Sequence, residues 1–178
     1  MEKKENAISV KVNSSDMVSE LTDRAVELIS LSRNAIEKNV NKVQTAANFL
    51  LGAWIVEVQQ EGNERAFYGK EVIKQLSANL TERLGKGYST ETLKNWRKFY
   101  LTYRDRIGKP VVSLFDADAK DKPAVSFSGD DFPFQLSWTH YLILMRIERP
   151  EERDFYEKEA VKRGWGKREL QRQYNSSL

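Results

Sequence analysis

The sequence of 178 residues has no cysteine and only one histidine, His140. Without thiols it cannot form disulfides, cysteine-based zinc sites or a cysteine nucleophile. A single histidine also argues against a Ser–His–Asp relay and against a metal site built on several histidines. Walker loops, dinucleotide-binding glycine fingerprints and H-E-x-x-H motifs are absent as well. We therefore expect neither a cofactor nor a metal ion, and no enzyme activity from this chain alone.

Long hydrophobic runs are also missing. No apolar stretch approaches the roughly 18 residues that a helix needs to cross a bilayer. The first ten residues, MEKKENAISV, lack the apolar core of a secretory signal. These features predict a cytoplasmic protein without a membrane partner, and the absence of cysteine agrees weakly with that location.

The residues that are present suffice for one hydrophobic core. Hydrophobic residues make up 40% of the chain and charged residues 31%, with four Trp, seven Tyr and eight Phe. The aromatic side chains supply large apolar surfaces, and this chain length fits one domain or one domain with an arm.

Charge is unevenly distributed, although the net charge is only +3. Residues 86–106 carry six Lys or Arg against two acids, and residues 162–172 carry five against one. Between them, residues 116–131 carry five Asp against two Lys. Two basic segments thus flank an acidic one, and basic segments of this kind suit an acidic partner.

In the N-terminal third, the sequence pattern predicts a flexible tail at 1–15 and a long helical arm at 16–60. Apolar residues recur there at spacings of three and four, which indicates a helix with one apolar stripe. The polar EKNVNK segment, residues 37–42, leaves two alternatives open, one continuous helix or two helices with a break. Because a small domain cannot cover so long a stripe, we expect a homo-oligomer that forms through this helix.

Residues 69–104 are typical of a helix-turn-helix unit. Gly85 follows the first helix at a position that favours a left-handed residue, and Ser89 is a good N-cap for the second. In the second helix Leu93, Trp96 and neighbouring aromatic residues fall on one side, while lysines fall on the other. One face therefore packs and the other offers cations.

The candidate DNA-binding residues lie in the turn and on that polar face. A recognition helix needs short polar and basic groups toward the major groove, and its N-terminus suits a phosphate. The residues that meet this need are Lys86, Tyr88, Ser89, Thr90, Lys94, Arg97 and Lys98. A helical hairpin with a solvated basic face is the competing interpretation, and it stays open here.

The remaining chain, within the helix-turn-helix-containing domain 61–178, begins with two β-prone runs. They form either a β wing at 110–128 or a surface loop. Further on, Ser137 is expected to cap a helix, Pro150 to open the next one and Gly164 to end it. His140 is expected to form structural hydrogen bonds, and Trp138 and Trp165 to pack in the core. The acids of EERDFYEKE, residues 151–159, are expected to pair along their helix.

Several of these segments resemble a known family. The marks are YG at 68–69, GKGYS at 85–89, FY at 99–100, SW at 137–138 with His140, FY at 155–156 and GW at 164–165. Over residues 20–178 the chain resembles the N-terminal domain of the YhcG-like PD-(D/E)xK nuclease family, domain of unknown function 1016. Gly166 departs from the family, which often has a serine-like cap there.

The resemblance implies a winged-helix-like DNA-binding module that delivers a nuclease to DNA. It implies no catalytic residues here, because the positions of the family's nuclease domain have no counterpart. We therefore expect a mainly α protein, a helix-turn-helix or winged-helix-like domain with a long N-terminal helix and a C-terminal helical extension. The alternative is a protein-interaction module that assembles a nuclease or a partner without contacting DNA.

Overall fold

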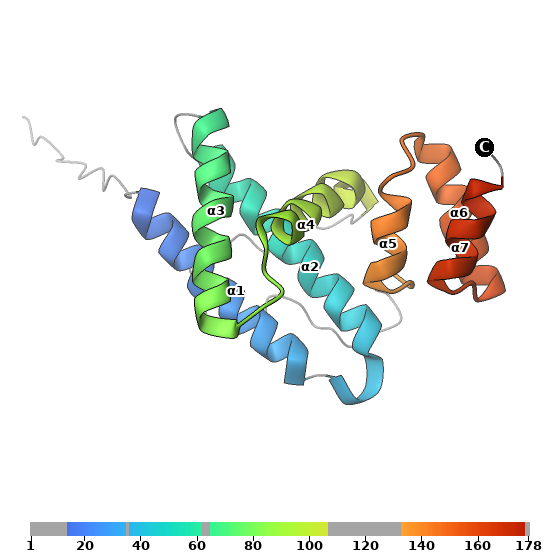
Figure 1. Cartoon of the computed structure of the whole chain (residues 1–178), viewed down its shortest axis with the longest axis horizontal. Coiled ribbons are helices and arrows are strands. Elements are labelled where there is room, and N and C mark those ends of the chain that lie inside the picture. Colours follow the sequence, from blue (N-terminus) through green and yellow to red (C-terminus); the bar gives the residue numbers. More distant parts are fainter. Residues whose placement is uncertain (1–13, 35, 62–64, 107–132, 177–178) are drawn as a thin grey trace, which may run out of the picture.

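The computed structural model describes residues 14–34, 36–61, 65–106 and 133–176, and helices account for most of them (Figure 1). The helices are α1 (Ser14–Asn34), α2 (Ile36–Glu61), α3 (Arg65–Leu84), α4 (Thr90–Tyr103), the 3-10 turn η1 (Arg104–Arg106), α5 (Trp138–Leu144), α6 (Pro150–Arg163) and α7 (Lys167–Asn175). The mainly α class is confirmed, and these ranges contain no strand. The expected wing at 110–128 lies outside the described residues.

The N-terminal segment forms two helices that fold back on each other. α1 and α2 lie side by side in Figure 1, and both also contact α3. The boundary between them precedes EKNVNK, which lies inside α2. Of the two alternatives, one continuous helix or two helices with a break, the structure shows two helices. The boundary lies slightly before the polar segment at which the break was expected.

The apolar stripe of α1 and α2 is covered within the chain. It joins residues of α3 and α4 in a first core cluster, so the segment expected as an arm supplies about half of a core. The homo-oligomer was expected on the ground that a small domain leaves part of this stripe uncovered. That reason no longer holds, so self-association through the stripe stays a prediction without this support. The buried stripe residues in this cluster are Met17, Leu21, Ala25, Leu28, Ala47, Leu50, Leu51, Trp54, Ile55 and Val58.

A glycine sets how closely α4 approaches α2. A Cβ built at Gly52 would lie 2.1 Å from the backbone oxygen of Trp96 and 3.0 Å from the Cβ of Tyr100. Contacts below 3.0 Å to backbone atoms cannot be relieved by rotating a side chain. Only glycine therefore permits α4 to lie this close to α2, with the Trp96 side chain 4% exposed.

A second, aromatic cluster connects this first half to the C-terminal helices. Phe49 of α2 and Phe99 of α4 meet edge to face at 5.6 Å between ring centroids. Phe99 also contacts Trp138 at 5.3 Å and Tyr141 at 5.0 Å, which brings α5 onto α4. Trp138 borders both clusters and Trp165 borders the second. Both are partly buried and pack against these clusters, which agrees with the expectation that they are core or staple residues.

His140 links the start of α5 to the turn between α6 and α7. Its Nδ1 lies 2.6 Å from Ser137 Oγ, and its Nε2 lies 2.9 Å from the carbonyl oxygen of Trp165. Because that carbonyl can only accept, Nε2 carries a proton and donates. The expected structural role of His140 is confirmed. Ser137 occupies the N-cap position, but its hydroxyl makes no capping bond because it turns to His140 and Thr139.

Two expected helix ends are confirmed by local geometry. Pro150 opens α6, where its fixed φ suits the first turn, and Gly164 ends it in the left-handed conformation at φ +64°. Within α6, Glu159 pairs with Arg163 one turn later, as expected for this acidic segment. Asp154 and Glu157 correct that expectation, because they pair with Arg106 outside the helix. α7 starts at Gly166, which has no side chain to cap it.

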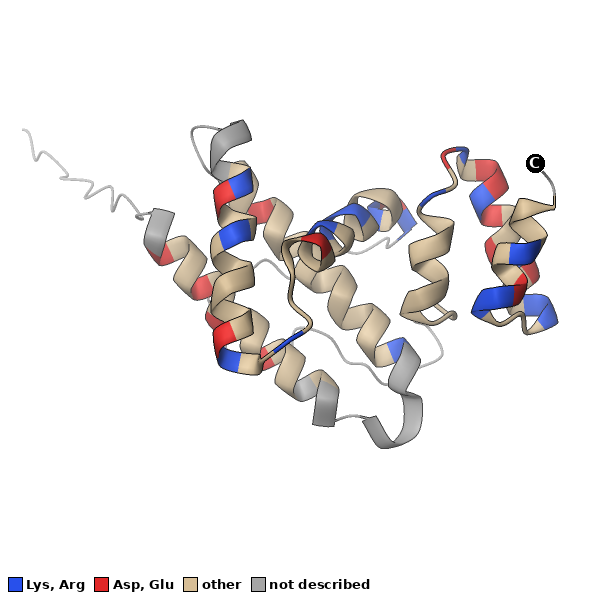
Figure 2. Cartoon of the chain, in the orientation of Figure 1, with Lys and Arg blue, Asp and Glu red and all other residues tan. Residues whose placement is uncertain are grey.

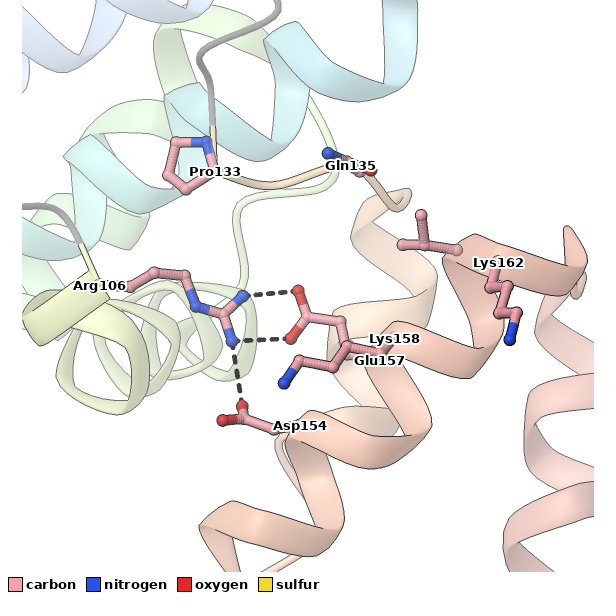
Figure 3. A pocket seen from close by; sticks show the side chains of 8 residues that line it. Arg106, Pro133, Gln135, Asp154, Glu157, Lys158 and Lys162 are labelled. Carbon is pink, nitrogen blue, oxygen red and sulfur yellow. Dashed lines mark hydrogen bonds and ion pairs between the residues drawn. The ribbon is translucent and has the colours of Figure 1, made fainter.

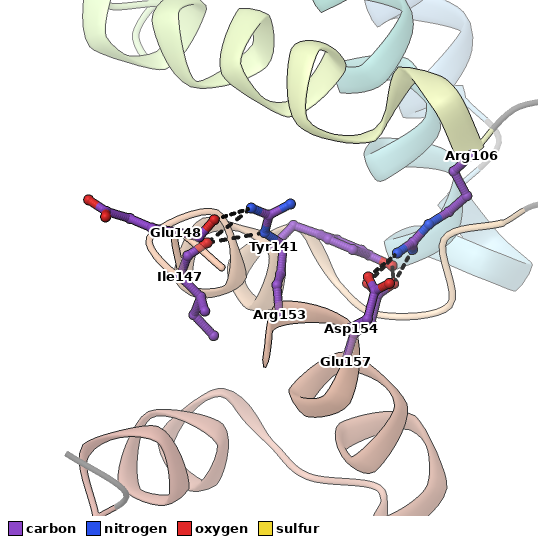
Figure 4. Close-up of polar contacts among 7 residues, drawn as sticks. All are labelled: Arg106, Tyr141, Ile147, Glu148, Arg153, Asp154 and Glu157. Atoms are coloured by element: carbon purple, nitrogen blue, oxygen red, sulfur yellow. Dashed lines mark hydrogen bonds and ion pairs between the residues drawn. The ribbon is translucent and has the colours of Figure 1, made fainter. Parts of the chain in front are cut away.

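An ion-pair network fastens the end of α4 to α6 (Figure 4). Arg106 Nη1 donates to Glu157 Oε1 at 2.6 Å, and Nη2 donates to Glu157 Oε2 at 2.9 Å and to Asp154 at 3.1 Å. Tyr141 of α5 donates its hydroxyl to Glu157 Oε1 at 2.9 Å. The Glu157 side chain is only 9% exposed. The bidentate arginine and the phenol together satisfy a carboxylate that would otherwise be costly to bury.

Tyr103 lies under this network with its hydroxyl unused. The Arg106 guanidinium sits 4.7 Å above its ring, a cation–π contact. Among the described residues the buried Tyr103 hydroxyl has no hydrogen-bond partner. Burial raises the pKa of both Tyr103 and Tyr141 above that of a free phenol, and the nearby negative charge of Glu157 raises it further. Both phenols therefore keep their protons in the folded state at neutral pH.

We expect Gly52→Ala to destabilise the fold by at least about 2 kcal/mol, because the new methyl group collides with the backbone of α4. The matched control is Gly166→Ala, where an added Cβ meets nothing within 4 Å and φ is ordinary. Urea unfolding followed by circular dichroism measures both free energies. Equal stability of the two variants would contradict the close approach of α4 to α2.

The two tyrosines predict opposite results for the same substitution. Tyr103→Phe removes an unsatisfied buried hydroxyl and should be neutral or stabilising. Tyr141→Phe removes a bond to a buried carboxylate and should cost about 1.5–3 kcal/mol. Urea unfolding at neutral pH compares the two variants, and a larger loss for Tyr103→Phe would refute the assignment.

The same phenols predict a pH dependence. Their pKa values are higher in the folded state, so the unfolded state loses phenolic protons first, from about pH 10 upward. The free energy of unfolding should therefore fall as pH rises above about 10 and stay unaffected by these groups below it. In each Phe variant the free energy of unfolding should decrease less between pH 9 and pH 11 than in the wild-type protein. Unfolding curves recorded at these two pH values measure the difference.

Candidate functional site

The turn between α3 and α4 has the geometry that its glycines indicated. Gly85 and Gly87 have φ values of +88° and +117°, and residues other than glycine rarely adopt such values. Ser89 caps α4 by accepting a hydrogen bond from the Thr92 backbone N–H at 3.2 Å. Ser77 of α3 donates its hydroxyl to the carbonyl of Tyr88 at 2.7 Å. The expected left-handed Gly85 and the Ser89 N-cap are confirmed.

Six of the seven candidate residues are exposed along this turn and on α4. Among these candidates Lys94 makes an ionic contact with a described residue, a 4.0 Å approach to Glu91, and the two side chains are 60% and 74% exposed. A pair this open and this long contributes little. No ion pair joins Arg97 or Lys98 to a carboxylate in the part of the chain that the structure describes. The exposed candidates are Lys86, Ser89, Thr90, Lys94, Arg97 and Lys98.

Tyr88 differs from the other candidates. It is 8% exposed, and its ring meets Trp96 edge to face at 6.2 Å between centroids. The expected place of this side chain beside a phosphate is therefore corrected, because its ring packs in the first core cluster. Sequence position next to Ser89 could not reveal this, since the residue after a Gly-Lys-Gly turn can point either way.

A basic groove of about 580 Å³ lies between α3 and α4. The sequence prediction placed cations on α4 alone, but Lys70 and Lys74 of α3 stand on the other side. Figure 2 shows the Lys and Arg bands of α3 beside those of α4. None of the described residues in the lining is a carboxylate. The residues that line the basic groove are Gln59, Gly69, Lys70, Ile73, Lys74, Thr90, Lys94 and Arg97.

The α2 end of the basic groove is held by a side-chain contact. Gln59 Nε2 donates to the carbonyl oxygen of Gly69 at 2.8 Å. Gly69 lies inside α3, which begins at Arg65 rather than near Gly69 as expected. The spacing of Lys70 and Lys74, four residues apart, did place them on one helical face. The sequence could not show that this face of α3 lies beside α4.

A second hollow, of about 420 Å³, lies beside the ion-pair network (Figure 3). Its lining mixes both signs of charge, with Asp154 and Glu157 opposite Arg106 and two lysines, Lys158 and Lys162. The two carboxylates already bond Arg106, so they neutralise it within the chain. This hollow therefore belongs to the packing of α6 on α4, and the basic groove is the stronger candidate site.

In the described ranges, no three His, Asp or Glu side chains gather in a way that could hold a metal ion. None of the helices that the structure describes is long and apolar enough to cross a membrane.

Comparison with known proteins adds the family. Residues 24–178 match the family described as DUF1016 N-terminal domain. The chain is 32% identical over 165 residues to "Putative nuclease YhcG" of Escherichia coli strain K12. That alignment covers 86% of this chain and 44% of the relative, so the chain spans less than half of the relative's length. No solved structure matches. The resemblance drawn from the sequence is confirmed, and the chain belongs to the DUF1016 N-terminal domain family.

Proposed function

We propose that this chain is a DNA-binding module that targets a PD-(D/E)xK-type nuclease and is itself not catalytic. The observation that carries the proposal is the exposed basic face of α4, where Lys94, Arg97 and Lys98 make no strong ion pair with another described residue. Cations without partners on a rigid helix attract a polyanion, because binding releases the counterions condensed on it. The curated relative is named a nuclease, which makes nucleic acid the polyanion to test first.

The way α4 is anchored supports this role. Leu93, Trp96 and Phe99 are buried on one side of the helix, so the opposite side stays exposed in a fixed orientation. A helix that enters a major groove needs one packed face and one polar face of this kind. A winged-helix-like arrangement around it is part of the proposal.

The alternative, a protein-interaction module, finds less support. Large exposed hydrophobic side chains among the described residues are Leu101, Phe155 and Val161. Phe155, 56% exposed, is the largest of them. Isolated apolar side chains of this kind are normal on protein surfaces, whereas protein interfaces usually contain a contiguous patch. A basic face with few acids suits an acidic partner better.

Replacing Lys94 and Lys98 together by Ala should weaken binding to duplex DNA. Each lysine that neutralises a phosphate contributes about 0.9 to the slope of log affinity against log salt concentration, so that slope should shrink by roughly two units. Stability should change within about 0.5 kcal/mol because both side chains are exposed. Fluorescence anisotropy with a labelled duplex over a salt series measures the slope.

The charge-conserving variant, Lys94→Arg with Lys98→Arg, is the matched control and should retain the wild-type slope. A folded Ala variant with unchanged affinity and slope would show that α4 does not contact DNA. The interaction-module alternative would then take precedence.

The chain alone should not cleave DNA, with or without Mg²⁺, because we assign it no catalytic carboxylate cluster. Incubation of supercoiled plasmid with purified protein and a divalent-metal series provides the measurement. Cleavage that disappears when one of the chain's own carboxylates is replaced would overturn the non-catalytic assignment.

A further inference from the structure

We infer that the basic groove is a seat for the phosphodiester backbone of one DNA strand, with Lys70 and Lys74 of α3 as its second wall. This inference rests on the proposed function and goes beyond it in two respects. It assigns direct DNA contacts to α3, the helix that would otherwise only support α4. It also makes the contact independent of base sequence.

The first argument is the placement of charge. Lys70 and Lys74 come from α3, and Lys94 and Arg97 come from α4, yet all four line one groove. All four residues are exposed, and the 4.0 Å approach of Lys94 to Glu91 is the one ion pair found for them within the described ranges. Like charges that face each other across a groove repel, so an anion between them relieves that repulsion.

The second argument is the chemistry of the lining. Among the described residues that line the groove, none has an aromatic side chain on which a base could stack. The amide side chain among them, Gln59, already uses its nitrogen on the Gly69 carbonyl, so it cannot make the paired contacts that read adenine. What remains is four cations and the Thr90 hydroxyl, the groups that proteins use to contact phosphate oxygens.

The third argument is the spread of the cations along the groove. Residues four apart on a helix have Cβ atoms about 6 Å from each other, so Lys70 and Lys74 extend along their wall. The groove volume of about 580 Å³ is also large for a single phosphate group. An extended polyanion therefore fits this site better than a small phosphorylated ligand does.

Phosphate contacts position a protein on DNA without reading its sequence. Binding through the basic groove should therefore be of similar strength on unrelated duplexes. A DNA footprint that spans both helices would also explain why the basic residues of α3 line up with those of α4.

The experiment uses a double variant of the full chain that carries both Lys70→Ala and Lys74→Ala. Its DNA binding is compared with that of the wild-type protein. Two labelled duplexes of unrelated sequence are titrated by fluorescence anisotropy over a salt series. The expected result is a salt slope smaller by roughly two units, equally on both duplexes. Lys70→Arg with Lys74→Arg should keep the wild-type slope, and circular dichroism should show that both variants fold.

A pair of exposed lysines outside the groove controls for total charge. Lys158 and Lys162 lie on α6, and their double Ala variant removes the same charge. Its slope should stay near that of wild type. An equal loss in this control would overturn the inference, because any lysine pair would then have the same effect. A loss confined to one duplex would overturn the sequence-independent contact.

The outcomes also separate this inference from the proposed function. If the Lys94 and Lys98 variant loses slope while the Lys70 and Lys74 variant does not, α4 binds DNA alone and only the inference about α3 fails. If wild-type protein binds neither duplex at low salt, the proposed function fails and this inference fails with it.

Discussion

The close packing of α4 on α2 at Gly52 is the constraint on which the rest of the structure depends. Because the position has no side chain, the backbone of α4 can contact α2 directly at Trp96. That contact buries Leu93, Trp96 and Phe99, and in doing so it fixes which side of α4 faces solvent. The exposed lysines are thus a consequence of a steric fit on the opposite side of the helix. A rigid basic face loses less entropy on binding than a flexible one.

The C-terminal helices depend on a polar contact that continues from the same helix. Arg106, the last residue of the turn η1 that follows α4, reaches Glu157 of α6, while Tyr141 of α5 shares that carboxylate. A buried ion pair is weak evidence for stability by itself, because desolvation offsets much of the attraction. Its effect here is specificity, since one carboxylate can satisfy both donors only when three elements meet in one arrangement. His140, the residue before Tyr141 in α5, makes a comparable link to the carbonyl oxygen of Trp165.

Many local features follow from the sequence alone. Ser89 caps α4, Pro150 opens α6, and Gly85 and Gly164 adopt left-handed conformations, because each outcome depends on residues within one turn. The apolar periodicity also identified the buried faces, since the helical repeat fixes which residues share a side. The mainly α class and the exposed cations of α4 were predictable for the same reason.

Only the tertiary structure decided which partners these elements meet. The break before Ile36 turned an expected arm into part of the core, and Tyr88 proved to pack on Trp96 instead of facing solvent. Lys70 and Lys74 joined the cations of α4 only because α3 lies beside it. These outcomes depend on how whole helices pack against one another, and no local spacing in the sequence encodes that packing.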